Sequence, residues 1–590
     1  MESLSSSFLQ KYTPTTPSPH PPSQVVRFKT KSVKIDEIPT KLAPFHDHQI
    51  ARTTNKVQKQ SLRCFIYSSL DNFICKFFDP PLRASIDPKH VLSGNFSPAD
   101  ELPPTACEVV EGVLPSCLDG AYIRNGPNPQ FIPQGPYHLF DGDGMLHSVR
   151  ILDGEATFCS RFIETYKYRV EREIGRPVML NVFSAFNGLA ASIARFAVHF
   201  GRILAGEYDP GRGFGTANTS LAFLGGQLFA LGESDLPYMI RVTPKGDITT
   251  LGRHESFGAP FTSMTAHPKI DPETHEAFAF RQSITFMPPF LTYFKINERG
   301  EKQQEVPVFS LPEPSLIHDF SVSKKYAIFP DTQMVMNLKN ILNGMPVVGV
   351  DPKKVPRLGI IPRDAVDESE LWWVEAPGFN MIHAVNAWDE DGGGGGEIIV
   401  MVATNVASAE HVLDRMDLVH SCLERIEINV KEKKIVKRRA LSPANLDFAV
   451  INPAYTAKKN RYIYAAIGAP MPKICGVVKI DTSLILTAGW EDCTVASRLY
   501  GHKCYGGEAI FVPRELDNPA SEEDDGYLVT YVHDEINVES KFIVMDAASP
   551  TLEIVAVVRL PQRVPYGFHG IFVRECDLKI CNLNPNYVIF

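Results

Sequence analysis

Residues 525–547, DGYLVTYVHDEINVESKFIVMDA, contain two runs of β-branched and aromatic residues separated by a polar turn. Runs of this composition and length predict the two strands of a hairpin. Similar runs bounded by Gly, Pro and Asp recur from about residue 108 to about residue 575, among them 138–151, 219–231, 239–251 and 396–406. This density of hairpin signals predicts an all-β body. There is no WD or kelch signature and no clean period, so the pattern alone does not separate a propeller from barrels or sandwiches.

The composition narrows the class of protein. The chain has 590 residues, of which 44% are hydrophobic and 22% charged, as in ordinary globular proteins. A net charge of −9 argues against nucleic acid as a partner, because that binding depends on an excess of Lys and Arg. Eleven cysteines without a C-x-x-C pair argue against a disulfide framework and against a cysteine-bound zinc. The sequence has no run of 18 apolar residues, so we expect no transmembrane helix.

The N-terminal residues differ from the rest of the chain. Residues 1–35 are rich in Ser, Thr and Pro, carry Lys and Arg, and contain Glu2 as their one acidic residue. They lack the apolar core of a secretory signal. An acid-poor, hydroxyl-rich leader indicates a transit peptide within residues 1–55, and the scarcity of Arg favours the plastid over the mitochondrion. The alternative is an unprocessed, disordered tail.

Two segments have helical rather than strand periodicity. Residues 56–80 include LRCFIYSSLDNFICKFF, and residues 177–207 include LNVFSAFNGLAASIARFAVHFGRILAG. Both place apolar residues three and four apart, which predicts amphipathic helices. In the second helix the apolar face consists of Phe183, Phe186, Ala190, Ile193, Ala197, Phe200 and Leu204, and the opposite, basic face of Arg195, His199 and Arg202. Such a helix suits a membrane interface or a cap on the β body, and the two can coincide around a substrate entrance.

Four histidines lie in similar local contexts, next to turn signals and mostly after apolar or small residues. They are His267 in SMTAHPKIDP, His318 in PSLIHDFSV, His383 in PGFNMIHAVNAWDED and His569 in VPYGFHGIFV. Each one alone is more typical of a hydrogen-bonded core histidine than of a metal ligand. Because their separations are long, they meet only if a closed β structure brings distant strands to one axis. Phosphate-binding loops, H-E-x-x-H and G-x-S-x-G are absent from the sequence, and Asp141-Gly-Asp143-Gly indicates a tight turn.

These segments resemble, in order, the four iron-ligand segments of the carotenoid cleavage oxygenase family. The resemblance runs from about residue 108 to 575 and includes RNGPNPQF, FDGDGMLH, TANTSL, ALGESDLPY, YGGEA and LPQRVPYGFHG. The sequence is most similar to the plant plastid subclass called carotenoid cleavage dioxygenase four. The segments that carry this similarity are DRMDLVH, NLDFAVINPAY, AAIGAPMPKICGVVK and EDDGYLVTYVHDE. Four matching histidine segments with matching text between them are a specific signal.

The resemblance implies a seven-bladed β-propeller over residues 81–578, with a helical cap over one face. It implies one Fe²⁺ per chain, held on the propeller axis by His267, His318, His383 and His569. It further implies that Glu233, Asp447 and Glu508 accept the second ring N–H of three of these histidines. Many family members have Glu in place of Asp447, so we expect a bridging water or a shifted backbone there. His147 and His533 lie outside the ligand segments, and we interpret them as structural.

The implied reaction is oxidative cleavage of one conjugated C=C bond of a carotenoid or apocarotenoid, with both atoms of O₂ entering the products. The subclass implies the 9,10 and/or 9′,10′ bonds, which yields apocarotenals and C13 ketones such as β-ionone. It also implies a plastid location, with a possible contact to membranes or plastoglobules and no role for nucleic acid. The alternatives are a 9-cis-epoxycarotenoid dioxygenase and a non-catalytic carotenoid-binding propeller. The last residues, 579–590, are atypical of the family, and we expect their deletion to leave the iron content unchanged.

Overall fold

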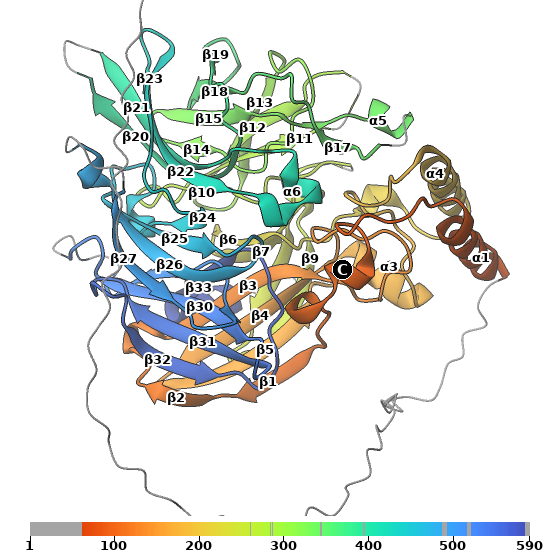
Figure 1. Ribbon diagram of the computed structural model, residues 1–590, viewed down its shortest axis with the longest axis horizontal. Helices are drawn as coiled ribbons and strands as arrows, with labels where there is room; N and C mark the ends of the chain where they lie inside the picture. Colours follow the sequence, from red (N-terminus) through yellow and green to blue (C-terminus); the bar gives the residue numbers. More distant parts are fainter. Residues whose placement is uncertain are drawn as a thin grey trace, which may run out of the picture. The chain divides into compact units, whose positions relative to one another are not determined.

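The computed structural model describes residues 62–583, apart from short gaps at 260, 284, 286, 343–344, 393–395, 487–491, 516–517 and 519–520. The predicted leader, residues 1–55, lies outside the described residues, as do the start of the segment 56–80 and residues 584–590 of the tail. The body built from residue 62 onward is almost entirely antiparallel β structure (Figure 1).

Seven sheets form the blades of a β-propeller, as predicted. Four blades each contain four consecutive strands. Two of them are β6(Ser220–Leu224), β7(Gln227–Leu231), β8(Tyr238–Val242) and β9(Ile248–Arg253), and β10(Lys269–Ile270), β11(Ala277–Gln282), β12(Leu291–Ile296) and β13(Lys302–Val308). The other two are β20(Met381–Asp391), β21(Glu397–Val406), β22(Ser421–Asn429) and β23(Lys434–Ala440), and β24(Leu446–Val450), β25(Tyr462–Gly468), β26(Ile474–Asp481) and β27(Thr494–Leu499). A fifth blade has the order β14(Ser321–Val322), β15(Tyr326–Asp331), β18(Arg357–Pro362) and β19(Trp372–Glu375). The hairpin β16(Met334–Met336) and β17(Val348–Val350) interrupts that blade and forms a separate two-stranded sheet.

The remaining two blades join the two ends of the chain. In one, β33(Gly570–Arg574) adds to β3(Gly120–Asn128), β4(Asp143–Leu152), β5(Glu155–Phe162) and β1(Leu102–Ala106). In the other, β2(Glu108–Gly112) adds to β32(Ile554–Arg559), β31(Glu539–Asp546) and β30(Gly526–Asp534), with β28(Cys504–Tyr505) and β29(Ile510–Pro513) also on β30. Both closures pair an early strand with a late one, so the ring of blades has no open ends.

The inner strands of neighbouring blades contact one another. Strand β20 contacts both β14 and β24, and β6 contacts both β3 and β33, although all of these belong to different sheets except β3 and β33. Between the blades lie apolar layers, such as the one in which Phe278, Phe280, Phe320 and Phe329 are fully buried. Most of the many Phe residues of such layers serve as core, which is the ordinary use of that residue.

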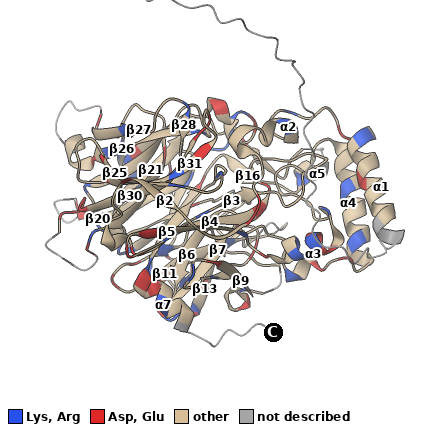
Figure 2. Cartoon of the chain, turned by 90° about the horizontal axis from the view of Figure 1, so that it is seen from below, with Lys and Arg blue, Asp and Glu red and all other residues tan. Residues whose placement is uncertain are grey.

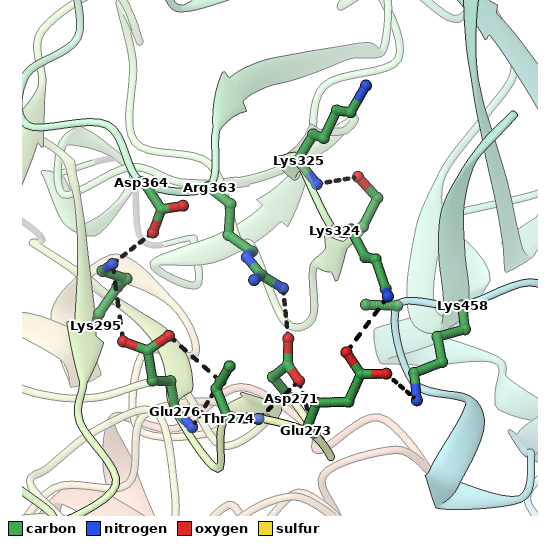
Figure 3. A network of polar contacts seen from close by, with 12 residues as sticks. Asp271, Glu273, Thr274, Glu276, Lys295, Lys324, Lys325, Arg363, Asp364 and Lys458 are labelled. Carbon is green, nitrogen blue, oxygen red and sulfur yellow. Dashed lines mark hydrogen bonds and ion pairs between the residues drawn. The ribbon is translucent and has the colours of Figure 1, made fainter. Parts of the chain in front are cut away.

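Polar contacts also connect the blades, and Figure 3 shows one such network around the β10–β11 turn. Asp271 accepts a hydrogen bond from Arg363, which follows β18, at 2.7 Å. Glu273 lies 2.8 Å from the ammonium group of Lys458, which precedes β25(Tyr462–Gly468). The Asp271 contact is buried, whereas Glu273 is more than half exposed, and exposed pairs add little stability.

Three of the longer helices lie on one side of the propeller (Figures 1 and 2). They are α1(Leu62–Phe77), α3(Tyr166–Ile174) and α4(Leu189–Leu204), and the short helices α5(Lys339–Leu342) and α6(His411–Asp414) lie on the same side. Helix α4 is shorter than the predicted segment. It begins after Gly188, whose φ of 83° is unfavourable for other residues. Phe183 and Phe186 therefore precede the helix, and Phe186 is 9% exposed.

The last helix, α7(Glu575–Leu583), contains the start of the atypical tail. Its residues Leu578 and Cys581 are buried in a cluster with β6, β7 and β8(Tyr238–Val242), and Asn582 donates a hydrogen bond to the carbonyl of Val242 at 3.1 Å. The first residues of the tail therefore pack on the apolar layer between two blades.

This packing leads to a prediction for the tail. Deleting residues 579–590 should lower the melting temperature, because Cys581 and Asn582 lose their contacts, while the bound iron per folded chain stays at the wild-type value. Thermal unfolding and metal analysis of the deletion variant test this. Leu578→Ala, which is expected to cost about 2–5 kcal/mol as a buried Leu→Ala change, is the matched comparison. A clear fall in iron in the folded deletion variant would contradict the prediction.

Candidate metal centre

The four predicted histidines come together at the axis, each from the start of an inner strand. His267 and His318 precede β10 and β14 by two and three residues, His383 lies in β20, and His569 directly precedes β33. Their ring centroids lie between 4.5 and 6.4 Å apart. One ligand nitrogen from each lies within 4.8 Å of all the others. Among the described residues this is the one cluster of His, Cys, Asp and Glu that meets such a test.

Three of the rings face a carboxylate through Nδ1. Nδ1 of His383 lies 2.7 Å from Oδ1 of Asp447, and Nδ1 of His569 lies 3.0 Å from Oε1 of Glu508. In the same way, Nδ1 of His318 lies 2.6 Å from Oε1 of Glu233. A carboxylate at Nδ1 holds the ring proton there and leaves the lone pair on Nε2, which is the arrangement found around metal-bound histidines.

Asp447 contacts His383 directly, so the bridging water that its short side chain led us to expect is not needed. Local irregularities of the backbone allow the short side chain of Asp447 to contact the ring of His383. The β24–β25 register shifts between Asp447 and Val450, and Phe448 between them has a φ of 48°. The β20–β21 register also shifts on both sides of Ala384, next to His383. Bulges of this kind re-aim neighbouring side chains, which lets the shorter acid meet the ring.

The fourth ring, His267, has a different environment. Its Nε2 lies 3.0 Å from Nε2 of His318, and its backbone N–H donates to Oγ1 of Thr265 at 3.1 Å. Burial, together with the neighbouring His318, His569 and His383, lowers the pKa of His267 well below its usual value. A neutral imidazole is the form that binds a metal ion.

Two of the carboxylates, Asp447 and Glu233, have pKa values below the usual range. Burial favours the neutral acid of Asp447, but the charge and hydrogen bond of His383 outweigh it, so the pKa of Asp447 is lowered. For Glu233 the effect of His318 likewise outweighs burial, and the pKa is lowered. The same contact raises the pKa of His318 against the opposite effect of burial.

The donor set fits a single first-row transition-metal ion. Nitrogens bound at the usual distance of about 2.1 Å lie at most about 4.2 Å apart across the ion, close to the spread of these four. The Nε2 atoms of His267 and His318 lie 3.0 Å apart, and Nδ1 of His318 faces Glu233, so both Nε2 atoms are placed to share one ion. Imidazole nitrogens suit iron, zinc, copper and nickel, so the donor set alone does not select among them.

Arg124 and Asn125 hold the segment that carries His569. The guanidinium of Arg124 donates to the carbonyl of Pro565, and Asn125 N–H donates to the carbonyl of His569 at 2.9 Å. A Cβ on Gly567 would approach Nε of Arg124 to 2.9 Å, so glycine is required for this close contact. The contact with Pro565 joins β3 to the segment before β33. His147 and His533 lie outside the cluster, and Nδ1 of His533 bonds to Ser540 at 2.9 Å.

Aromatic rings continue from the cluster toward a cavity. The ring of Phe448 lies 5.2 Å from His383 and 5.3 Å from His569. Phe568, the neighbour of His569, packs on Phe140 at 5.7 Å, and Phe140 packs on Phe183 at 5.3 Å. Phe183 lines a cavity of about 640 Å³ that is also bordered by β16, β17, α5 and α6. Sequence reasoning did not single out Phe140, Phe448 or Phe568, because nothing distinguishes them from core residues before the fold is known.

A propeller with four axial histidines, three of them facing carboxylates, defines a structural class whose donor set suits one metal ion. The comparisons identify the family within that class. The family model described as Retinal pigment epithelial membrane protein matches residues 95–574. A probable chloroplastic carotenoid cleavage dioxygenase 4 of Arabidopsis thaliana is 57% identical over 90% of this chain and 89% of its own length. A chloroplastic 9-cis-epoxycarotenoid dioxygenase of Oryza sativa is 53% identical over 88% of this chain and 81% of its own.

Solved structures agree with this result. A Synechocystis apocarotenoid oxygenase variant superposes with a TM-score of 0.68 at 25% identity, covering 84% of this chain and 100% of its own. A Pseudomonas brassicacearum lignostilbene dioxygenase has the same fold, with a TM-score of 0.68 at 22% identity over 82% of this chain and 98% of its own. The chain belongs to the carotenoid cleavage oxygenase family, and it is an oxidoreductase of the dioxygenase class.

Proposed function

We propose that this protein binds one Fe²⁺ through His267, His318, His383 and His569 and uses it to cleave a conjugated double bond of a carotenoid or apocarotenoid with O₂. The observation that carries the proposal is the convergence of the four rings, with ligand nitrogens within 4.8 Å of one another. Bound Fe²⁺ would supply the redox chemistry with O₂, and both oxygen atoms would enter the two carbonyl products, so that no external reductant is required.

The protein's own residues would then position and shield the reactants. Glu233, Asp447 and Glu508 keep the Nδ1 protons of three rings in place, so that the Nε2 lone pairs stay directed inward. Phe448 covers His383 and His569 on one side and limits how a long apolar molecule approaches them. Because the double bonds of a polyene are chemically alike, such positioning determines which bond is cut.

For the substrate we propose the 9,10 and/or 9′,10′ double bonds, with apocarotenals and C13 ketones such as β-ionone as products. The resemblance of residues 444–481 and 524–535 to the plastid subclass four supports this choice. The relative that is 57% identical is named a carotenoid cleavage dioxygenase, and the one that is 53% identical is named a 9-cis-epoxycarotenoid dioxygenase. Cleavage of 9-cis-epoxycarotenoids is therefore the second candidate. A propeller that binds carotenoids without cleaving them is a third possibility, which the complete set of four histidines disfavours.

The central experiment measures iron and products together. Protein lacking about the first 55 residues is incubated aerobically with β-carotene, with apocarotenals and with 9-cis-epoxycarotenoids, beside His383→Ala and the control His533→Ala. We expect one iron per chain and β-ionone from the wild type and from His533→Ala, and neither from His383→Ala. Products from the epoxycarotenoids alone would select the second candidate. A folded wild type that binds no iron would overturn the proposal.

The carboxylates allow a finer test of the metal site. Asp447→Asn keeps the shape of the side chain but removes its charge, so iron affinity should fall about 10- to 100-fold. The matched control is Asp481→Asn in β26(Ile474–Asp481) of the same blade, where the acid pairs with Arg461 at 2.8 Å. Competition with a metal chelator measures the affinity. Equal affinities of the two variants would contradict the assigned role of Asp447.

We further propose that α1 and α4 form a membrane-contacting surface and that the protein works in the plastid, at membranes or plastoglobules. The two helices lie side by side in both views (Figures 1 and 2). Their outward residues are apolar and 41–73% exposed; they are Phe65, Ile66, Leu70, Phe73 and Phe77 of α1 with Leu189, Ile193, Phe196, Phe200 and Leu204 of α4. Among the described residues no helix is long and apolar enough to span a bilayer.

The basic face of α4 points toward the body of the protein. Arg202 is 3% exposed and pairs with Asp71 of α1, and Arg195 pairs with Asp79. The cations therefore bind the two helices together and to the body, and the apolar side faces outward. A contiguous exposed apolar surface of this kind is typical of proteins that lie in a membrane interface. Names of the plant relatives that include the word chloroplastic support the location.

Liposome flotation tests the surface. Phe196→Glu/Phe200→Glu should remove most of the membrane-bound fraction, because two charges would have to enter the interface. The control Ile536→Glu/Val538→Glu changes residues that are equally exposed, at 62% and 65%, in the β30–β31 turn, and it should float like the wild type. Equal flotation of both double variants would contradict the proposed surface.

A further inference from the structure

A buried ion pair connects the segments that carry three of the four histidines. Oδ1 of Asp319 lies 2.7 Å from Nζ of Lys269, and Oδ2 of Asp319 accepts a hydrogen bond from the backbone N–H of Ala384 at 2.8 Å. Lys269 follows His267 by two residues, Asp319 follows His318 directly, and Ala384 follows His383 directly. We propose that the Lys269–Asp319 pair is a positioning device that sets the spacing of these three histidines; the proposal rests on their role as metal ligands.

The pair connects three consecutive blades at the level of the metal centre. Lys269 lies in β10, Asp319 precedes β14, and Ala384 lies in β20, and each of these strands opens its own sheet. Strand β14 forms a ladder of two residues, with Ser321 and Val322 pairing with Ile328 and Ala327. The hydrogen-bonded ladder therefore begins only after His318, and the side chain of Asp319 provides the link that this stretch of backbone lacks.

The side chains leave little freedom at this link. The Asp319 side chain is 3% exposed, and its Oδ1 also accepts from the N–H of Phe320 at 2.7 Å. Nζ of Lys269 additionally donates to the carbonyl of Ala384 at 3.5 Å, which closes a ring of contacts through Asp319. A displacement of any one of the three segments would have to break a charged contact in a buried place, and such contacts are costly to break.

The pair adds no net charge to the centre. Three carboxylates already face the histidines, and a fourth unpaired one at Asp319 would make the centre more negative. Lys269 neutralises the charge of Asp319, and the oxygens of Asp319 still accept hydrogen bonds from Ala384 and Phe320. The pair therefore fixes distances without changing the electrostatic balance that the ion experiences. Buried ion pairs are weak contributors to stability compared with apolar packing, so their use at one defined place indicates a role in specifying geometry.

The chain contains a matched pair that lacks these connections. Lys354 and Asp331 form a contact with side-chain exposures of 16% and 2%, against 19% and 3% for Lys269 and Asp319. Asp331 ends β15 and Lys354 precedes β18 of the same blade, and neither is adjacent to a histidine of the cluster. Asp331 also pairs with Arg357 at 2.8 Å, so Lys354→Met leaves it a cation and the stability losses of the two lysine variants need not be equal. A positioning role predicts that only the loss of Lys269 changes metal binding.

The test titrates the metal-free full-length protein with Co²⁺ and follows the visible absorption of the bound ion, beside thermal unfolding. Lys269→Met and Asp319→Asn should bind Co²⁺ at least about tenfold more weakly than the wild type, with an altered spectrum. Lys354→Met should lose stability but keep the wild-type affinity and spectrum. Lys269→Arg, which retains the ion pair, should restore most of the affinity.

The outcomes separate this inference from the proposed metal centre. Folded Lys269→Met and Asp319→Asn proteins that bind Co²⁺ with the wild-type affinity and spectrum would overturn the positioning role alone, even if their melting temperatures fall. A wild type that binds no Co²⁺ would overturn the metal centre and this inference together. If Lys269→Met does not fold, Lys269→Gln, which keeps an N–H donor without the charge, replaces it under the same criteria.

Discussion

The pairing of β33 with β3 is the contact on which the rest of the structure depends. It joins the last strand of the propeller to one of the first, with Arg124 opposite Gly570 in the register. His569 is the residue immediately before β33, so the pairing that closes the ring of blades also positions one candidate ligand. In a chain whose seven blades have no common sequence period, this closure is what converts a row of sheets into a ring with an axis.

Electrostatics explains why so many polar groups are placed around that axis. Four neutral imidazoles would leave the full charge of a divalent ion in a region of low dielectric constant, which is unfavourable without nearby negative charge. Three carboxylates provide that charge and at the same time hold the ring protons. Arg124 brings a buried positive charge close to Glu508 and packs against Gly507 and Gly567. The polar groups therefore form one connected arrangement rather than a set of separate hydrogen bonds.

The sequence predicted the all-β class from local signals, because strand composition and turn residues act over a few positions. It did not predict the number of blades or the convergence of the histidines, because both depend on contacts between residues hundreds of positions apart; these came from family resemblance. The link through Lys269 and Asp319 escaped notice for a related reason. An isolated Lys or Asp in a β protein is most simply interpreted as a surface residue, and only the fold brings them together with Ala384 in a buried place.

The orientation of α4 shows a limit of periodicity as evidence. The three- and four-residue spacing correctly indicates two faces, but it does not say which of them contacts the protein. Arg195 and Arg202 would be solvent-facing in most amphipathic helices, yet here acidic partners at Asp79 and Asp71 draw them inward. Because these pairs hold the basic side of α4 against the protein, the apolar side faces outward. The pattern assigned Phe183 and Phe186 to that side, but both residues precede the helix. Phe183 lines the cavity, and its ring belongs to the aromatic series that leads to His569. The same segment thus joins the helix that carries the exposed apolar residues to the aromatic series that ends beside His569.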